Sequence, residues 1–300
     1  MDPWSPLGVI REQERTATGG AVSSLTVLLA GAECPYTCVF CDLWKNTLDG
    51  PTPPGALPQQ LAQALSHYGR VPPGARLKLY NASNFFEERA VPAADLERLA
   101  GMAGSFDRVV VECHPRLVDD HCAEFAARLE GDLEVAMGLE CVHPEALPRF
   151  NKQMSLEDWN RAAARLETAG IPFRAFVLIS PPFVPQSESV DWTLISTAYA
   201  LDSGAETVTL IPLRVESSSA DLAEPSLEQI ELAFARALDL QESYVRDSPR
   251  AVLLDTWDLD RFAREADCAE CREPRLSRLR RMNLSGERME PVACEACSAG

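Results

Sequence analysis

The stretch SLTVLLAGAECPYTCVFC, residues 24–41, joins a run typical of a buried β-strand to three closely spaced cysteines. Cys34, Cys38 and Cys41 all lie within eight residues. Most closed metal sites have four protein ligands, so three thiolates predict a metal centre with one open position for a small molecule. Zinc with three cysteines and a water would also be open. Three ligands in so short a loop, however, fit around a bulky iron-sulfur cubane more easily than around one ion.

Apolar runs alternate with amphipathic segments along the chain. Strands are expected over residues 24–31, 76–82, 107–113, 133–140, 172–180 and 207–213, with a seventh over 251–259. Helices are expected over residues 57–67, 93–102, 117–129, 155–169, 190–201 and 226–240. Ser155 and Asp158 predict a capping box at the start of the fourth helix. The alternation is typical of βαβ units and a parallel sheet, and it predicts an α/β fold, a partial (β/α)6 TIM-like barrel.

A change in composition divides the chain near its end. After residue 262 the sequence becomes rich in Cys, Arg and Glu. Three parts are therefore expected: an N-terminal extension (1–23), the barrel (24–262) and a small Cys-rich metal-binding tail (263–300) similar to a zinc ribbon. In a parallel barrel the functional loops follow the C-terminal ends of the strands, which is where the three cysteines of the first loop begin.

Charge and composition exclude some classes of protein. The 300 residues carry a formal net charge of -17, which argues against broad electrostatic binding to nucleic acid or to an anionic membrane. The N-terminus does not resemble a secretory signal, and no stretch stays apolar long enough to cross a bilayer. We therefore expect a soluble, cytoplasmic protein without a membrane partner. Its ten cysteines should be reduced thiols that are available to metals.

The pattern C-x3-C-x2-C, with Phe40 directly before the last cysteine, resembles the signature of the radical S-adenosylmethionine (SAM) superfamily. The resemblance covers roughly residues 24–255. It implies that Cys34, Cys38 and Cys41 hold a [4Fe-4S] cluster whose open iron chelates SAM, with Phe40 beside the cofactor. It further implies reductive cleavage of SAM, hydrogen abstraction from an unidentified substrate, and an electron donor such as flavodoxin or ferredoxin.

Four further residues are candidate SAM contacts by this resemblance. Asn81 and Ser83 stand where the superfamily commonly has a Gly-Gly-Glu-like turn, although ordinary turn chemistry explains both residues equally well. Glu112 and Glu140 each end an expected strand at the barrel mouth, where a carboxylate can bind the methionine ammonium or the ribose hydroxyls. A plain surface or salt-bridge role is the alternative for each carboxylate.

Two segments resemble one subgroup of the superfamily. GLECVHPEALPRFNKQMS (138–155), followed by FVLISPPF (176–183), is similar to the subgroup containing the Elongator catalytic subunit and the archaeosine-forming radical enzyme. The tail cysteines make the match to the archaeosine enzyme family closer. Both relatives act on tRNA, so the resemblance implies a modified tRNA nucleoside as a candidate substrate. No second domain of acetyltransferase size is expected. We therefore do not expect this chain to carry out the complete Elongator reaction.

The tail carries a second Cys motif. Cys268-x2-Cys271 and Cys294-x2-Cys297 are separated by twenty-two residues, which predicts a four-Cys zinc site; an auxiliary iron-sulfur cluster and a metal-free tail are the alternatives. Six arginines lie between the two pairs and offer either a grip for tRNA phosphates or a solvated face. The alternative to an enzyme is a catalytically inert metal-binding interaction or RNA-binding module. Structural roles are expected for Cys113, His114, His121, Cys122 and Cys141.

Overall fold

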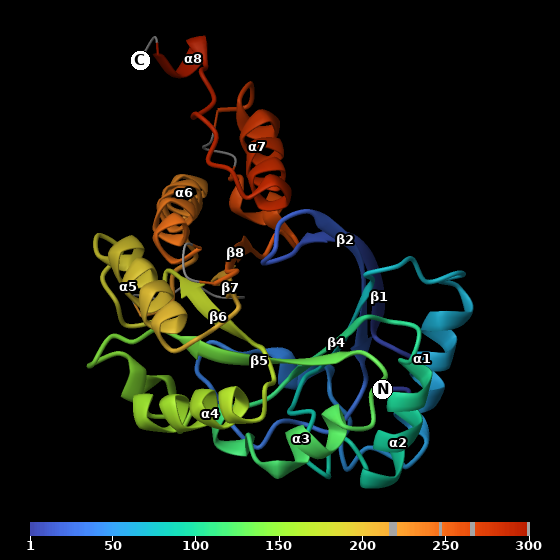
Figure 1. Ribbon diagram of the computed structural model, residues 1–300. Coiled ribbons are helices and arrows are strands. Elements are labelled where there is room, and N and C mark those ends of the chain that lie inside the picture. Colours follow the sequence, from blue (N-terminus) through green and yellow to red (C-terminus); the bar gives the residue numbers. More distant parts are fainter. Residues whose placement is uncertain (216–220, 246–247, 265–267, 299–300) are drawn as a thin grey trace.

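Eight strands form one curled sheet in which each strand pairs with the next along the chain (Figure 1). The computed structural model describes residues 1–215, 221–245, 248–264 and 268–298. The strands are β1 (Gly8–Arg15), β2 (Ala21–Leu29), β3 (Arg76–Asn81), β4 (Arg108–Glu112), β5 (Asp132–Glu140), β6 (Phe173–Ile179), β7 (Thr207–Pro212) and β8 (Ala251–Leu254). Strands β2 to β8 are parallel, and β1 is antiparallel to β2. The prediction of an α/β partial barrel is confirmed.

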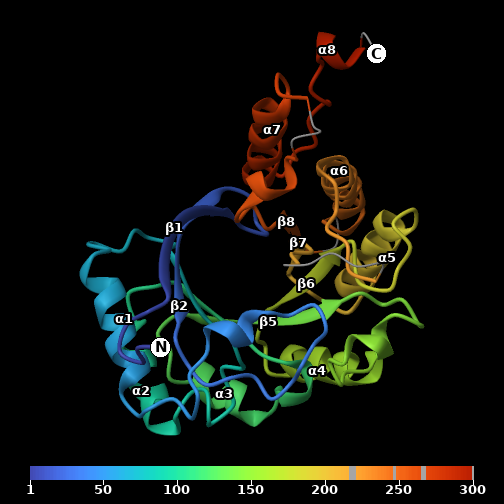
Figure 2. The ribbon, with the colours of Figure 1, turned by 180° about the vertical axis from the view of Figure 1, so that it is seen from behind.

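Helices cover the outer face of the sheet (Figures 1 and 2). They are α1 (Ala56–Ser66), α2 (Ala93–Met102), α3 (Asp120–Ala126), α4 (Leu156–Thr168), α5 (Ser189–Asp202) and α6 (Leu227–Tyr244), followed by α7 (Arg272–Ser285) and α8 (Glu295–Ser298) in the tail. The expected capping box of Ser155 and Asp158 is present at the start of α4. Helix α3 is shorter than expected because a 3-10 turn, Pro115–Leu117, precedes it and Asp119 caps it. No helix in the described parts of the chain is long and apolar enough to cross a membrane.

Strand β1 was not expected from the sequence, which placed these residues in an N-terminal extension. Its residues, GVIREQER, lack an apolar run because this edge strand presents charged side chains. Two of them are paired inside the barrel: Glu12 Oε1 lies 2.8 Å from Lys78 Nζ, and Glu14 Oε1 lies 2.8 Å from Arg76 Nη1. Hydropathy alone therefore hides a strand whose charges are neutralised by its neighbours in the sheet.

A buried ion network closes the barrel at the N-terminal ends of the parallel strands. Arg174 on β6 bonds both Glu14 on β1 and Glu134 on β5, each at 2.8 Å. Lys78 also pairs with Glu14. Burial alone would raise the pKa of Glu14, but the charges of Arg174 and Lys78 hold that pKa well below its ordinary value. The floor of the barrel thus contains a network of paired charges, and the opposite end is open for a site.

Side chains close the gap between β1 and β8, the two edges of the sheet. Arg15 Nη2 on β1 donates to the carbonyl oxygen of Val252 on β8 at 2.7 Å. The Asn283 amide on α7 accepts from the Leu254 N–H at 2.7 Å and donates to the Leu254 carbonyl at 3.0 Å. Helix α7 therefore satisfies the free backbone groups of Leu254, as another strand would.

Candidate functional site

The loop that carries Cys34, Cys38 and Cys41 follows β2 at the open end of the barrel. All three cysteines are free and partly buried. The loop is anchored by the Val39 N–H, which donates to the Phe150 carbonyl at 3.0 Å, and Phe40 packs edge-on against Phe150. Burial raises the pKa of all three thiols, that of Cys38 to about 12. A bound cation would reverse this shift, because metals bind the thiolate form.

Asn81 ends β3 and has a side chain without a partner. The residue is 5% exposed, and neither its amide oxygen nor its amide nitrogen finds a hydrogen bond among the described residues. Leaving such a group unsatisfied costs about 1–3 kcal/mol. A ligand that offers both a donor and an acceptor would remove this cost. The amino and carboxylate groups of SAM are such a pair, although Asn81 does not line the cavity inside the barrel.

The turn after β3 supports the cysteine loop directly. Asn84 Nδ2 donates to the sulfur of Cys34 at 3.5 Å, and its Oδ1 accepts from the His114 N–H at 2.7 Å. Ser83, a predicted SAM contact, donates instead to the Glu87 carboxylate at 3.0 Å. Asn84 was missed from the sequence, because an Asn in a turn is also explained by ordinary turn chemistry.

Glu140 ends β5 and forms a buried ion pair, the salt-bridge alternative considered from the sequence, with a partner that the sequence did not identify. Lys152 Nζ lies 2.5 Å from Glu140 Oε1, and both side chains are about nine-tenths buried. Glu140 has a positive φ of 66°, a backbone conformation that is unfavourable for this residue type. Lys152 belongs to the segment that resembles the subgroup, but the sequence assigned it no role. Its burial was the missing information, since an isolated Lys is normally exposed.

His114 holds the backbone of Lys152 in place. Its Nε2 donates to the Lys152 carbonyl at 2.9 Å, and its ring stacks on Tyr36 at 3.8 Å between centroids. Burial and the nearby Lys152 charge lower the pKa of His114 to about 3, so the imidazole is neutral at physiological pH. The expected structural role of His114 thus includes positioning residues around the cysteine loop.

Glu112 ends β4 and faces the same space without a partner. No hydrogen bond or ion pair of its carboxyl group is present in the described parts of the chain, and Lys152 pairs with Glu140 instead. Burial, together with the negative charge of Glu140, raises the pKa of Glu112 to about 8. At neutral pH this carboxyl therefore holds a proton, which it can donate in a hydrogen bond.

Some of the predicted residues border a cavity of about 940 Å³ inside the barrel, whereas Cys34, Cys38, Asn81 and Ser83 are not among its lining residues. Phe40, Cys41, Glu112 and Glu140 line its end near the cysteine loop. Trp257, which follows β8, and Leu284 on α7 also line it. The volume is in the range of small-molecule sites, and the lining combines apolar walls with a few polar groups. The fold thus brings the predicted residues Phe40, Cys41, Glu112 and Glu140 to one cavity.

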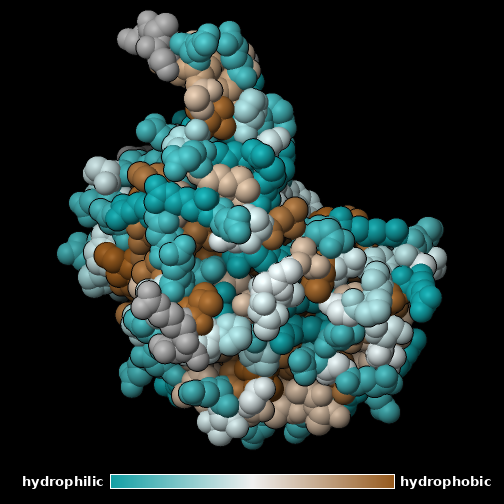
Figure 3. Space-filling view, turned by 45° about the horizontal axis from the view of Figure 1, so that its top comes forward, coloured by the Kyte–Doolittle hydropathy of each residue, from teal (hydrophilic) through white to brown (hydrophobic). Residues whose placement is uncertain are grey.

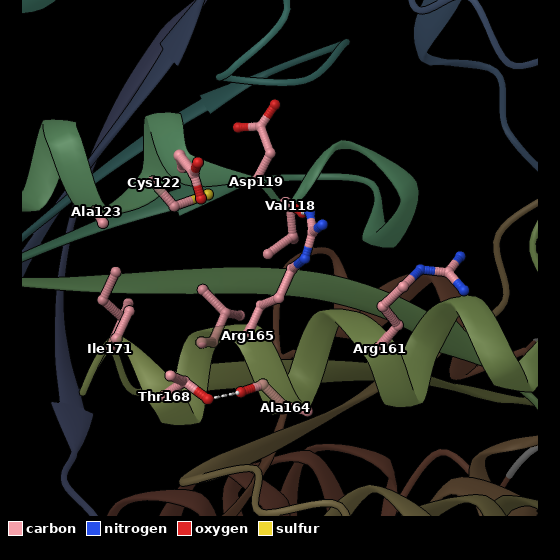
Figure 4. A pocket seen from close by; sticks show the side chains of 12 residues that line it. Val118, Asp119, Cys122, Ala123, Arg161, Ala164, Arg165, Thr168 and Ile171 are labelled. Atoms are coloured by element: carbon pink, nitrogen blue, oxygen red, sulfur yellow. Dashed lines mark hydrogen bonds between the residues drawn. The ribbon is translucent and has the colours of Figure 1, made fainter.

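A smaller cavity of about 420 Å³ lies on the outer surface between α3 and α4 (Figure 4). Arg165 extends from α4 across it and donates to the Val118 carbonyl at 2.9 Å. Cys122 also lines it. None of the residues at the cysteine loop borders this cavity, so it is separate from the candidate site.

The four tail cysteines form a compact group. Their sulfur atoms all lie within 4.8 Å of one another, and two pairs, Cys268 with Cys294 and Cys271 with Cys297, are 3.7 Å apart. Four thiolates at 2.3 Å from one tetrahedral zinc ion would be about 3.8 Å apart. Backbone N–H groups lower the pKa of Cys268 to about 7, which favours its thiolate. The group is therefore a possible metal site with single-ion geometry.

The segment between the two cysteine pairs differs from the expected zinc ribbon. Residues 272–285 form helix α7, which ends at Gly286 with a positive φ of 72°. This segment is rich in Arg and Leu, which favour a helix, and Gly is the preferred residue at such a C-terminus. The tail projects beyond the rest of the surface (Figure 3).

Most of the arginines in this segment are already paired within the chain. Arg275 and Arg278 contact Glu231 on α6, Arg280 contacts Asp260 and Glu273, and Arg288 contacts Asp239. Each cation thus has a carboxylate partner, which offsets its charge. The basic surface expected from the sequence is correspondingly weaker than the count of arginines implies.

Comparisons with known proteins agree on the fold. No protein-family model matches the chain. The chain is 22% identical over 208 residues to the uncharacterized protein MJ0550 of Methanocaldococcus jannaschii, a match that covers 65% of this chain and 57% of that protein. The chain therefore spans little more than half the length of this relative.

Solved structures of radical SAM enzymes superimpose on the barrel. The Elp3 protein of Methanocaldococcus infernus matches with a TM-score of 0.54 and 12% identity, covering 86% of this chain and 63% of that one. A radical SAM methyltransferase from Sphaerobacter thermophilus matches with a TM-score of 0.54 and 15% identity, covering 85% and 78%. The anSMEcpe protein with bound AdoMet and Cp18Cys peptide matches with a TM-score of 0.55 and 11% identity, covering 76% and 62%. The resemblance to the superfamily is confirmed at the level of the fold: this chain has the fold of the radical SAM enzymes.

Proposed function

We propose that this protein is a radical SAM enzyme that abstracts hydrogen from a substrate held in the barrel cavity. The observation that carries the proposal is the position of Cys41 and Phe40, which border the 940 Å³ cavity from the loop that follows β2. An inert binding module, the alternative, would not need three partly buried thiols in one loop, one of which, Cys41, borders the cavity. The solved structures of the same fold include one with bound AdoMet.

Each residue of the site has a role in this proposal. Cys34, Cys38 and Cys41 would ligate a [4Fe-4S] cluster, which, when bound with SAM, supplies the 5'-deoxyadenosyl radical. The amide of Asn81, which has no hydrogen-bond partner among the described residues, would bind the methionine part of SAM. Glu140, held by Lys152, would accept hydrogen bonds from the ribose hydroxyls. Phe40 and Glu112 would border the cofactor, and Ser83 would stabilise the adjoining turn. A donor such as flavodoxin or ferredoxin would deliver the electron.

Anaerobic reconstitution with iron and sulfide tests the proposal. The wild type should show a broad absorbance at about 400 nm, which is typical of thiolate-ligated iron-sulfur clusters. On reduction it should form 5'-deoxyadenosine from SAM. Cys38→Ala should lose both properties. Cys141→Ala, which removes a buried thiol outside the loop, is the matched control and should retain both. Full cluster loading and SAM cleavage by Cys38→Ala would contradict the proposal.

We also propose that the four tail cysteines bind one zinc ion. The support is the 3.7 Å separation of the paired sulfurs, since a cubane would need its ligands farther apart. Elemental analysis of the purified protein should find one zinc per chain. Cys294→Ser should lose the zinc and keep the iron of the first loop. A second set of iron atoms that depends on Cys294 would instead identify an auxiliary cluster.

A tRNA nucleoside, the candidate substrate implied by the resemblance, receives little support from the charges of the tail. Arg280 already pairs with Asp260 and Glu273, so its charge is largely compensated. Filter binding with total cellular tRNA at two salt concentrations tests this candidate. If the tail binds the tRNA phosphates, replacing Arg280 and Arg281 together by Ala should weaken tRNA binding and reduce its salt dependence. Equal binding by both proteins would remove the tail from tRNA recognition.

A further inference from the structure

Helix α7 belongs both to the metal-binding tail and to the wall of the barrel cavity. Arg280, Asn283 and Leu284 on this helix border the same cavity as Cys41 and Glu112. In Figures 1 and 2 the helix stands near β8 and β1, the two edge strands of the sheet. The barrel therefore lacks a complete wall without a segment that lies between the two cysteine pairs.

The C-terminal half of α7 is fixed to the edges of the sheet. Asn283 makes two hydrogen bonds to the backbone of Leu254, at 2.7 Å and 3.0 Å. Gly286 ends the helix so close to Arg15 that an added Cβ would lie 2.6 Å from the guanidinium group. Arg15 in turn donates to the Val252 carbonyl. This end of the wall is held by direct contacts with β1 and β8.

The N-terminal end of α7 depends on the cysteine group. Cys271 directly precedes the helix. Its sulfur lies 3.7 Å from that of Cys297, which follows the helix in the sequence and lies in α8. Other contacts at this end include the ion pair of Arg275 with Glu231 on α6, at 2.6 Å, and the Arg272 guanidinium, which donates to the Arg264 carbonyl at 2.9 Å. A metal ion that joins the four sulfurs would lock this end, because it cross-links the segments on both sides of the helix.

Large exposed apolar side chains lie in the cavity lining, next to polar residues such as Asp258 and Arg280. Trp257 is 52% exposed and Leu284 is 43% exposed, although both border the cavity. Leu43, from the cysteine loop, borders it as well and is 50% exposed. Covering large apolar side chains at the mouth of a cavity removes their surface from water, which lowers the free energy of the complex and favours binding.

We propose that α7 and Trp257 form a substrate-selecting wall on which an apolar group of the substrate packs, and that the metal-loaded cysteine group holds this wall in place. Trp257 and Leu284 are then specificity-determining residues. The proposal rests on the proposed function, since it takes the barrel cavity to be the substrate cavity. It assigns the tail a place in substrate recognition through apolar contact rather than through its arginines.

Binding of the neutral fluorophore N-phenyl-1-naphthylamine to the reconstituted protein tests the apolar wall. The wild type should bind the probe saturably, with energy transfer from tryptophan. Leu284→Asp and Trp257→Ala should each weaken binding about tenfold, the effect of losing one good apolar contact. Leu232→Asp is the matched control, because Leu232 on α6 is 48% exposed and does not border the cavity. Wild-type affinity in both wall variants, or an equal loss in the control, would overturn the proposal.

Hydrogen exchange tests the role of the cysteine group. Cys294→Ser should accelerate amide exchange in α7 and at Leu254, whose N–H donates to Asn283, while β4 and β5 exchange as in the wild type. Unchanged exchange in α7 would show that the metal does not hold the wall. Neither experiment requires SAM cleavage. A wild type that fails to form 5'-deoxyadenosine would refute the proposed function, whereas the probe and exchange results would still decide whether the wall exists.

Discussion

Lys152 Nζ lies 2.5 Å from Glu140 Oε1, and this buried ion pair fills the space that a side chain on Gly138 would occupy. A Cβ atom at position 138 would lie 2.3 Å from Lys152 Nζ and 2.0 Å from Glu140 Oε1. An added Cβ at Gly138, two residues before Glu140 on β5, would therefore force the ends of the Lys152 and Glu140 side chains to shift. In the segment 138–140, the absence of a side chain on Gly138 leaves space for the Glu140–Lys152 ion pair.

Gly138→Ala should separate Lys152 from Glu140. Breaking a buried ion pair costs about 3–5 kcal/mol when a charge is left uncompensated, so we expect a clear loss of thermal stability and weaker SAM binding. Gly101→Ala is the control: nothing lies within 4 Å of an added Cβ at this position in α2, and Ala favours a helix. Calorimetry and SAM titration check both variants. A Gly138→Ala protein as stable as the Gly101→Ala protein would show that the pair can shift at little cost.

Asn81→Leu should weaken SAM binding without destabilising the protein. The amide of Asn81 has no partner to lose, so replacing it with an apolar side chain of similar size removes a desolvation cost. Asn283→Leu gives the contrast, because that amide satisfies both backbone groups of Leu254 and its removal should destabilise the fold. Denaturant unfolding and equilibrium dialysis with SAM measure the two effects. Loss of stability in Asn81→Leu would indicate a structural role for this amide.

Glu112→Gln should remove a pH dependence of stability. The pKa of Glu112 is about 8 in the folded protein, above its ordinary value of 4.5. At a pH between these two values, unfolding therefore releases a proton from Glu112. The free energy of unfolding of the wild type should therefore fall as the pH rises through this window. Gln cannot ionise, so the variant should be more stable than the wild type at pH about 9 and similar to it at pH about 5. Parallel pH profiles of the two proteins would mean that Glu112 ionises normally.

Asn84→Ala should lower the reduction potential of a cluster on the cysteine loop. Asn84 Nδ2 donates to the sulfur of Cys34, and hydrogen bonds to ligand sulfurs stabilise the reduced, more negative state of such clusters. Anaerobic redox titration compares this variant with Ser83→Ala, whose hydroxyl contacts Glu87 and not a cysteine. Equal potentials for both variants would place the Asn84 contact outside the electronic control of the cluster.

Local patterns in the sequence were enough to predict seven parallel strands and the site of the cysteine loop. The strand over 24–31 is apolar, and the cysteines follow it without a break. Buried parallel strands read as continuous apolar runs, because helices and the barrel interior exclude water from both faces. Strand β1 escaped this pattern: its charges lie opposite Lys78, Arg76 and Arg174, residues that are remote in sequence.

The sequence by itself determined the alternation of strands and helices, the three-cysteine loop and the four-cysteine spacing, because each depends on residues that are neighbours along the chain. Only the tertiary structure decided which side chains meet. It paired Lys152 with Glu140, left the Asn81 amide without a partner, and brought Leu284 of the tail to the rim of the barrel cavity. Burial and pairing are set by packing between distant segments, and no local pattern records the distance between two such residues.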